Sequence, residues 1–402
     1  MIQFTFHLLS FILFSYLAIT TSYLLVMALA GKFAMNAPFQ MTATKRRIIV
    51  LIPSYKEDDI IIDTAVKCAR QDYPSSFFQI LVIADSLKKN TLEKLRAIPV
   101  NVLEVKFDIS TKARSLSAAL ESVKNDHFEI AVILDADNIM EDSCLEQINN
   151  AFNNNHKAIQ CHRSAKNHNT IVAQLDAISE EININLFRRG PAVLGLSAMP
   201  LGSGMAFDFT LLLDIFGTPG IVDNVAEDRE IEIQLMKRKI KMIFLNNAIV
   251  YDEKVKGSGV FQKQRTRWME AQLNQIRRFF KPDLSGISKT PDYFIIFFQS
   301  LLLPRLLYLL TCCIVLTVIL FQWAYDSSFI YPLPGYWICW MITYFIVLLV
   351  SIPYRYFTLK TLVAIRYIPV LMISMLKAIF KLKRNRKEFL HTSKTFDTDN
   401  DV

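Results

Sequence analysis

The sequence lacks the cysteine and glycine patterns that mark the commonest metal, redox and nucleotide sites. Its six cysteines show no CxxC pair and no regular spacing, which argues against a zinc site or a disulfide framework. We therefore expect them to be buried, small hydrophobic residues in a reducing compartment. No GxGxxG motif follows the first predicted strand, and no GxxxxGK[ST] motif occurs anywhere. The absence of both motifs argues against a dinucleotide-binding Rossmann domain and against a P-loop ATPase.

Charged residues are almost absent from three long stretches, 4–30, 304–325 and 336–353. Each has about the length of a membrane-spanning helix, which takes roughly 17–25 residues. The first lacks the basic start of a signal peptide and is too long for one, so we predict a retained anchor. A further apolar stretch at 361–382 is interrupted by Arg366 and Lys377. This interruption favours an amphipathic helix lying in the membrane interface.

Basic residues are distributed unevenly, within a formal net charge of +8. They follow the first apolar stretch, and those between residues 354 and 394 are opposed only by Glu388. The connector at 326–335 has no Lys or Arg. The positive-inside rule therefore predicts a multi-pass integral protein of the inner or plasma membrane, with the central domain and the C-terminus cytoplasmic. No groove-reading helix accompanies the basic run, so we expect no nucleic acid partner.

The residues between the apolar stretches read as a globular domain with alternating strands and helices. Short apolar runs at 47–53, 79–85 and 129–137 predict buried parallel strands, separated by helical patterns. The alternation predicts a doubly wound α/β sheet with its ligand at the carboxyl ends of the strands. We therefore divide the chain into an N-terminal transmembrane anchor and linker (1–44), a cytosolic domain (45–285), and a region of interfacial helices, two transmembrane helices and a basic cytosolic tail (286–402).

Acidic residues follow two of these predicted strands. Asp135 and Asp137 form a DxD motif at the end of the strongest strand, and Asp85 ends what we expect to be the neighbouring strand. An isolated DxD is equally typical of a strand-end turn. Three carboxylates converging at one edge would repel one another without a cation, however. Mg²⁺ typically takes one or two carboxylates, with water and substrate phosphates in its other positions.

Three weaker signals each have an ordinary structural explanation. The acids around Asp228 open a predicted helix, where they complement the helix dipole, although Asp228 also suits a base facing a cleft. Gly202 and Gly204 are typical of a bend as well as of a binding loop. Lys112, taken alone, is a solvated lysine. The basic stretch at 260–272, with a single Trp268, is by itself typical of an amphipathic helix at a membrane surface.

Taken together and in this order, these residues resemble the membrane-embedded family 2 glycosyltransferases of the GT-A fold. That branch includes the chitin, cellulose, hyaluronan and poly-N-acetylglucosamine synthases. The resemblance runs from about Ile48 to the FLHTSKT segment at 389–395. Its motifs are IPSYKE at 52–57, the acid after the second strand, K…SAAL at 112–120, DAD at 135–137, GSGMAF at 202–207, AEDR at 226–229 and QxxRW at 264–268. QxxRW is the most specific of these motifs and DxD the least.

The resemblance implies a role for each matched position. Pro53, Tyr55, Glu57, Asp85 and Lys112 would line the uridine diphosphate pocket, Asp135 would contact the nucleotide, and Asp137 would bind Mg²⁺ or Mn²⁺. Gly202, Ser203 and Gly204 would lie near the acceptor, Asp228 would be the general base, and Gln264, Arg267 and Trp268 would close over the donor diphosphate and the acceptor sugar. AEDR is closer to the chitin-synthase-like form than to the TED of cellulose synthases, which indicates an N-acetylglucosamine donor.

The implied function is inverting, metal-dependent transfer from a UDP-sugar to a growing polysaccharide. Three membrane crossings are too few to line a polymer channel, however. Either a small membrane partner subunit or a second copy of the chain completes the channel, or the enzyme transfers few sugars to a lipid-linked acceptor. A catalytically silent, nucleotide-binding membrane adaptor is a further alternative. It is disfavoured because Asp85, Asp137 and Asp228 are all retained, as is Arg267. The few spans also disfavour a transporter.

Overall fold

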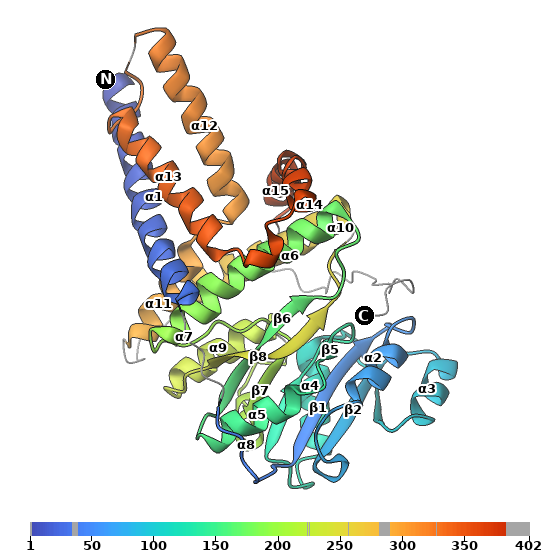
Figure 1. Cartoon of the computed structure of the whole chain (residues 1–402). Coiled ribbons are helices and arrows are strands. Elements are labelled where there is room, and N and C mark those ends of the chain that lie inside the picture. The colour runs from blue at the N-terminus through green and yellow to red at the C-terminus, as the bar shows by residue number, and fades with distance from the viewer. Residues whose placement is uncertain are drawn as a thin grey trace.

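An eight-stranded mixed sheet forms the centre of the globular part (Figure 1). The computed structural model describes residues 2–33, 39–222, 224, 226–255, 257–280, 290–326 and 328–382. The strand order is β3-β2-β1-β4-β7-β6-β8-β5. The first four are mutually parallel, β7 is antiparallel to both of its neighbours, and β6 is parallel to β8. The strands are β1 (Ile48–Tyr55), β2 (Phe78–Asp85), β3 (Asn101–Val105), β4 (Ile130–Ile133), β5 (Ile139–Met140), β6 (Ala158–Ala165), β7 (Met205–Asp208) and β8 (Ile243–Asp252).

Helices cover both faces of the sheet, which is why the parallel strands are continuous apolar runs. Along β1, Ile48, Val50 and Ile52 belong to one hydrophobic core, whereas Ile49 and Leu51 belong to the other. The first core is shared with α2 (Ile61–Cys68), α3 (Lys89–Arg96) and α5 (Cys144–Asn153), and the second with α4 (Lys112–Ser122), α8 (Phe209–Phe216) and α9 (Glu227–Lys237). Both cores therefore position the same strand ends, from opposite sides.

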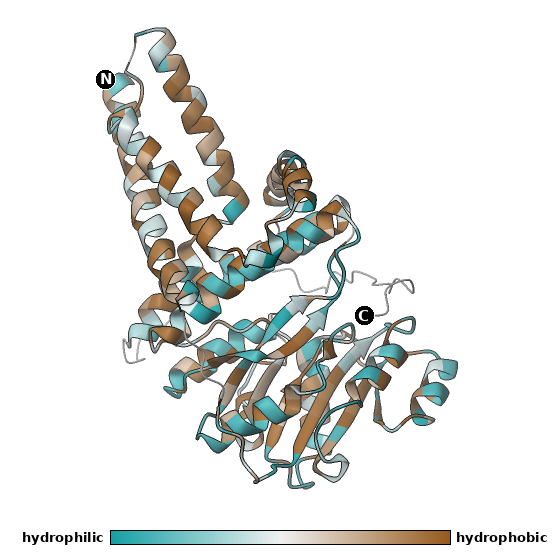
Figure 2. Cartoon of the chain, in the orientation of Figure 1, coloured by the Kyte–Doolittle hydropathy of each residue, from teal (hydrophilic) through white to brown (hydrophobic). Residues whose placement is uncertain are grey.

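Three helices of the described residues are long and apolar enough to cross a membrane: α1 (Ile2–Lys32), α12 (Arg305–Ala324) and α13 (Pro334–Ser351). They project together from the sheet domain (Figure 1), and the colouring of Figure 2 shows that hydrophobic residues predominate along them. They coincide with the three stretches predicted to span. The fourth apolar stretch forms α14 (Leu359–Ile365) and α15 (Ile368–Phe380), which are bent by 47° relative to each other and would make a fourth span only if taken as one unit.

The first of these helices docks on the domain through a very close backbone approach. After α6 (Ile171–Ile184) the chain forms a π-helical turn at Asn185–Arg189 and then α7 (Gly190–Val193). The Asn185 side chain donates to Ala28 O at 3.1 Å and to Ser351 Oγ at 3.2 Å, which links α1 to α13. A Cβ atom at Gly190 would lie 2.3 Å from Met27 O. Only glycine at this position allows α1 to approach so closely.

Helix α6 lies between the sheet and the apolar helices α1 and α13 (Figure 1). Its buried acids point to three different elements. Asp176 pairs with Arg265 of α10 (Ser258–Phe279), and Glu180 pairs with Arg163 of β6 and with Lys254. Glu181 pairs with Arg355, which follows α13. The sheet, α10 and the end of α13 are thus all held by ion pairs to one helix.

Some sequence expectations lie outside the described residues or differ from the structure. The basic tail and the FLHTSKT segment, both after residue 382, and residues 286–289 are outside the described residues. All six cysteines are free, as expected. Cys313 and Cys339 are exposed, however, because they lie on outward faces of α12 and α13, so the prediction of six buried cysteines is wrong.

Candidate active site

Polar residues gather where the parallel strands β1 and β2 end. Pro53 and Tyr55 belong to β1, Glu57 follows it, and Asp85 ends β2 directly beside Tyr55. The Asp85 carboxylate is buried. Its Oδ1 accepts from Ser86 Oγ at 2.9 Å, whereas Oδ2 has no hydrogen-bond partner among the described residues. A buried acceptor without a donor is costly, so this oxygen suits a ligand that donates an N–H group.

Lys112 lies at the centre of a second polar cluster. It begins α4, after Thr111 caps the helix by accepting from Arg114 N at 3.1 Å. Its Nζ lies 2.5 Å from Asp135 Oδ1, 2.5 Å from Gly202 O and 3.3 Å from Glu227 Oε1. The side chain is only 18% exposed. Taken alone, Lys112 was expected to be solvated. The structure shows instead a mostly buried lysine that contacts three other segments.

The two carboxylates in this cluster hold the lysine in its charged form. Burial alone would lower the pKa of Lys112, but the neighbouring charges of Asp135 and Glu227 outweigh it and raise that pKa above its ordinary value. Burial raises the pKa of Glu227, while Lys112 opposes this effect. Glu227 was not singled out in the sequence, because an acid in a first helical turn is explained by the helix dipole.

The GSG segment faces Asp228. Gly202 and Gly204 have φ angles of +82° and +64°, which side chains other than glycine rarely adopt. Ser203 Oγ accepts a hydrogen bond from Asp135 N at 2.9 Å. A Cβ atom at Gly202 would lie 3.7 Å from Asp228 Oδ2, in van der Waals contact, so the glycine lies directly beside that carboxylate. The structure thus brings together Lys112, Asp135, the GSG segment and Asp228.

Asp85 is separated from the two acids of the DxD motif, with which it was expected to converge around a cation. Strand β1 lies between β2 and β4, so Asp85 does not end the strand next to the DxD motif, as the sequence had suggested. Two strand spacings of about 4.8 Å each separate the two strands. In the described part of the chain no group of three His, Cys, Asp or Glu side chains is arranged to hold a metal ion. The prediction that three acids meet is therefore wrong.

Asp137 lies beside a different acid, Asp252 at the end of β8. Burial, with help from Glu180 and Asp137, raises the pKa of Asp252 to about 6, although Lys254 and Arg163 oppose the shift. The Asp137 side chain is itself buried. Because Mg²⁺ needs only one or two carboxylates when phosphates supply the remaining ligands, Asp135 and Asp137 fit a diphosphate-bound cation without a third protein ligand.

The QxxRW motif lies on α10, which packs on α6 and α9. Gln275 Nε2 donates to Glu232 Oε2 at 2.7 Å, and Arg278 Nη2 lies 3.2 Å from Glu230 Oε1. These contacts hold α10 against the helix that carries Asp228. Gln264, Arg267 and Trp268 all belong to the first half of α10.

Arg265, within the motif, has a structural environment that the sequence did not reveal. Its Nη2 lies 2.5 Å from Asp176 Oδ1. Its guanidinium lies 4.5 Å from the ring centroid of Phe261 and 4.0 Å from that of Trp268. Trp268 is 37% exposed, although the Arg265 guanidinium stacks on its ring. The spacing of Phe261, Arg265 and Trp268 places them on one helix face, a signal that could have revealed the stack.

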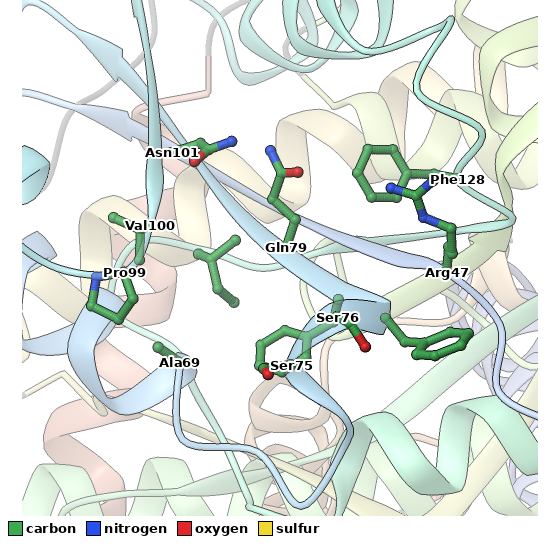
Figure 3. Close-up of a pocket in the computed structure, with 12 residues that line it drawn as sticks. Arg47, Ala69, Ser75, Ser76, Gln79, Pro99, Val100, Asn101 and Phe128 are labelled. Atoms are coloured by element: carbon green, nitrogen blue, oxygen red, sulfur yellow. The ribbon is translucent and has the colours of Figure 1, made fainter.

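A pocket of about 490 Å³ lies at the opposite end of the sheet (Figure 3). Its lining includes Arg47 and Gln79, at the amino ends of β1 and β2, together with Phe128, Ser75 and Asn101. In α/β sheets of this kind the ligand lies at the carboxyl ends of the strands. The cluster around Lys112, and not this pocket, is therefore the candidate active site.

A family model described as "Glycosyltransferase like family 2" matches residues 46–271, more than half of the chain. The chain belongs to this family. It is therefore a glycosyltransferase, and the resemblance inferred from the ordered motifs is confirmed. The matched residues contain the whole cluster around Lys112 and most of α10.

Relatives of this glycosyltransferase include poly-β-1,6-N-acetyl-D-glucosamine synthases. That of Staphylococcus epidermidis is 22% identical over 323 residues, which cover 78% of this chain and 76% of the relative. That of Staphylococcus aureus is 21% identical over 256 residues, or 63% of this chain and 60% of the relative. A mannosyltransferase of Pyrobaculum calidifontis, solved in complex with GDP-Man and Mn²⁺, is similar in structure with a TM-score of 0.58 and 17% identity. It is matched over 98% of its length and 92% of this chain, and this likeness confirms the predicted GT-A fold.

Proposed function

We propose that this glycosyltransferase moves N-acetylglucosamine from its UDP derivative, with inversion, to a growing polysaccharide or another saccharide near the membrane. The observation that carries the proposal is the cluster around Lys112. There the GSG segment contacts the lysine that pairs with Asp135 and also faces Asp228. The residues proposed as nucleotide-side acid, acceptor segment and base therefore belong to one group of contacts, which supports the proposal. The naming of the staphylococcal relatives supports the choice of sugar.

Asp228 is the proposed general base. In an inverting transfer a carboxylate takes the proton of the acceptor hydroxyl while its oxygen attacks the anomeric carbon. The Oδ2 atom of Asp228 faces the space beside Gly202, where an acceptor hydroxyl would approach. Gly202, Ser203, Gly204 and Trp268 are assigned to the acceptor. General-base catalysis of this kind contributes typically about 10²–10⁴-fold.

The donor would be held by the edge formed by β1 and β2. The unpartnered, buried Oδ2 of Asp85 would accept the single ring N–H of uracil. Pro53, Tyr55, Glu57 and Lys112 would line the rest of the nucleotide pocket, with Asp135 beside it and Gln264 and Arg267 toward the diphosphate. An arginine there would stabilise the negative charge that develops on the leaving group.

Asp137, with Asp135, would hold Mg²⁺ or Mn²⁺ on the diphosphate. A bound divalent cation neutralises charge on a departing diphosphate. The chain's own part is to place both carboxylates, and Lys112 holds Asp135 by an ion pair.

Membranes containing the protein should incorporate radiolabelled N-acetylglucosamine from UDP-N-acetylglucosamine when Mn²⁺ or Mg²⁺ is present, and not when EDTA replaces it. UDP-glucose and GDP-Man serve as competing donors in the same assay. Incorporation that persists in EDTA would contradict the metal assignment, and preferential use of GDP-Man would contradict the uracil pocket. Measuring the size of the product distinguishes a polymer from the addition of one or a few sugars.

Limited transfer to a lipid-linked acceptor is the second candidate, and the packing of the helical bundle favours it. Tyr308, Trp337 and Tyr344 are almost completely buried between the three apolar helices. The rings of Tyr308 and Tyr344 stack at 5.0 Å. Side chains thus fill the interior of the bundle. A polymer would need a passage completed by a partner subunit or by a second copy of the chain.

We further propose that α1, α12 and α13 cross the inner or plasma membrane as the anchor (1–44) and the C-terminal region (286–402), with the catalytic domain (45–285) cytoplasmic. Alkaline phosphatase, which is active only outside the cytoplasm, should be inactive when fused after residue 402. When it replaces everything after residue 333, between α12 and α13, it should be active. The reverse pattern would overturn the orientation, whatever the enzyme's substrate.

A further inference from the structure

The chain from residue 199 to residue 204, here called the 199–204 loop, lies outside regular secondary structure and leads into β7. Most of it is buried next to Asp228. Buried backbone groups outside a ladder must find other partners, since an unpaired one costs as much as a lost hydrogen bond. The hydrogen-bond donors to its carbonyl groups therefore show which residues hold the loop in place.

Gln160 supplies partners for one end of this loop. It lies in β6 and is completely buried. Its Nε2 donates to Ser203 O at 2.9 Å and to Gly204 O at 3.1 Å, while its Oε1 accepts from Leu201 N at 2.8 Å. The same Nε2 lies 3.0 Å from Cys161 O, and Gly204 O also accepts from Cys161 N at 2.7 Å, so the amide adds side-chain bonds at the point where the loop joins the sheet.

Arg188 supplies partners for the other end. It lies in the π-helical turn, only 4% exposed. Its Nε donates to Met199 O at 2.9 Å and its Nη2 donates to Pro200 O at 3.0 Å. The planar, forked guanidinium suits two successive carbonyl groups, which a lysine ammonium would not hold in the same way.

Lys112 completes the set, since its Nζ donates to Gly202 O at 2.5 Å. The carbonyls of residues 199, 200, 202, 203 and 204 therefore all accept from side chains of three other elements. The loop is fixed in one conformation, with Gly202 in front of Asp228. Small misplacements of a reacting group are costly, because about 1 Å reduces a rate on the order of 10²-fold.

We propose that Gln160 and Arg188 are positioning residues that fix the 199–204 loop, and through it the acceptor, against the base. The link to the acceptor rests on the function proposed above, whereas the fixing of the loop does not. Neither residue would touch the sugar or the nucleotide. Both would act through the backbone of the 199–204 loop, which would contact the acceptor.

The test compares Gln160→Met and Arg188→Lys with wild-type protein in detergent. Hydrogen–deuterium exchange of peptides covering residues 199–204 reports the loop, and UDP binding reports the donor pocket. Initial rates of sugar transfer, with acceptor varied, report catalysis. We expect faster exchange at 199–204, unchanged UDP binding, and a transfer rate reduced on the order of 10²-fold. The conservative lysine variant guards against simple loss of folding.

Asn149→Leu is the matched control. Asn149, in α5, is also completely buried. Its side chain accepts from Arg46 N and Tyr73 OH and donates to Thr44 O and, at 3.5 Å, to Thr42 Oγ1, close to the residues that precede β1. It should lose a similar amount of stability without faster exchange at 199–204 and without slower transfer.

Each outcome is decisive for one part of the proposal. Unchanged exchange at 199–204 in both variants would overturn the positioning role, whatever their activity. Faster exchange with undiminished transfer would overturn its link to catalysis, and so would equal loss of transfer in the Asn149→Leu control. If wild-type protein transfers no sugar at all, the proposed function fails, and the exchange data still decide whether Gln160 and Arg188 fix the loop.

Discussion

Replacing Asp228 with asparagine should abolish sugar transfer while leaving UDP binding nearly intact. The amide has the shape of the carboxylate but cannot take the acceptor's proton, so the rate should fall by about 10²–10⁴-fold. Donor binding should persist because the contacts proposed for the nucleotide lie on other segments, β1, β2 and the start of α4. Transfer kinetics and UDP titration of the purified protein measure the two effects separately.

The control for this variant is Asp214→Asn. Asp214 is an exposed carboxylate on α8, with its Oδ2 2.7 Å from Arg238 Nη2. Exposed ion pairs contribute little, so this change should alter neither transfer nor binding. A loss of UDP binding in Asp228→Asn would move Asp228 from the acceptor side into the donor pocket. Full activity of that variant would remove its role as the base.

Replacing Gly190 with alanine should separate α1 from the domain. The new Cβ atom would lie 2.3 Å from Met27 O, a backbone atom that cannot move without shifting the whole helix. Overpacking of this kind typically costs about 1–3 kcal/mol, and contact with backbone places this case at the upper end. We expect a clear fall in the melting temperature of the detergent-solubilised protein and a loss of monodisperse material.

Gly335→Ala provides the matched substitution. Gly335 lies in the first turn of α13, and a Cβ atom there would meet no other atom within 4 Å. Because alanine favours helix over glycine by about 1 kcal/mol, this variant should be as stable as the wild type or slightly more stable. If Gly190→Ala melts at the wild-type temperature, the close docking of α1 on the π-helical turn is incorrect.

The parts of the fold that were predictable are those with strong local signals. The parallel strands β1 and β2 follow from unbroken apolar runs, and the three apolar helices follow from length and missing charge. The four-residue strand β7 was not predicted, because its sequence is short and its pairing with β4 and β6 depends on residues far away in the chain. The order of the strands, which separates Asp85 from the DxD motif, is likewise set by contacts between distant segments.

In the candidate site, too, the residues that could be predicted are those with a local sequence signal. Asp135, Asp228 and the glycines were found because their residue types and order match family motifs. Glu227 and Gln160 were missed because nothing local distinguishes a buried acid or amide from a surface one. In QRTRW the sequence drew attention to Arg267, whereas the buried arginine stacked on Trp268 is Arg265. Two arginines two residues apart on a helix face different ways, and only the packed structure shows which side each one takes.

Helix α6 connects three parts of the structure. Its acids hold the sheet through Arg163, the helix of the QxxRW motif through Arg265, and the end of α13 through Arg355. Removing one partner of a buried pair typically costs about 3–5 kcal/mol, which applies to Arg163–Glu180 and Arg265–Asp176. Arg355 is more than half exposed, so its pair with Glu181 contributes less. Helix α6 therefore couples the sheet, α10 and the segment that follows α13 to one another. A change in the tilt of this one helix would therefore shift all three partners together.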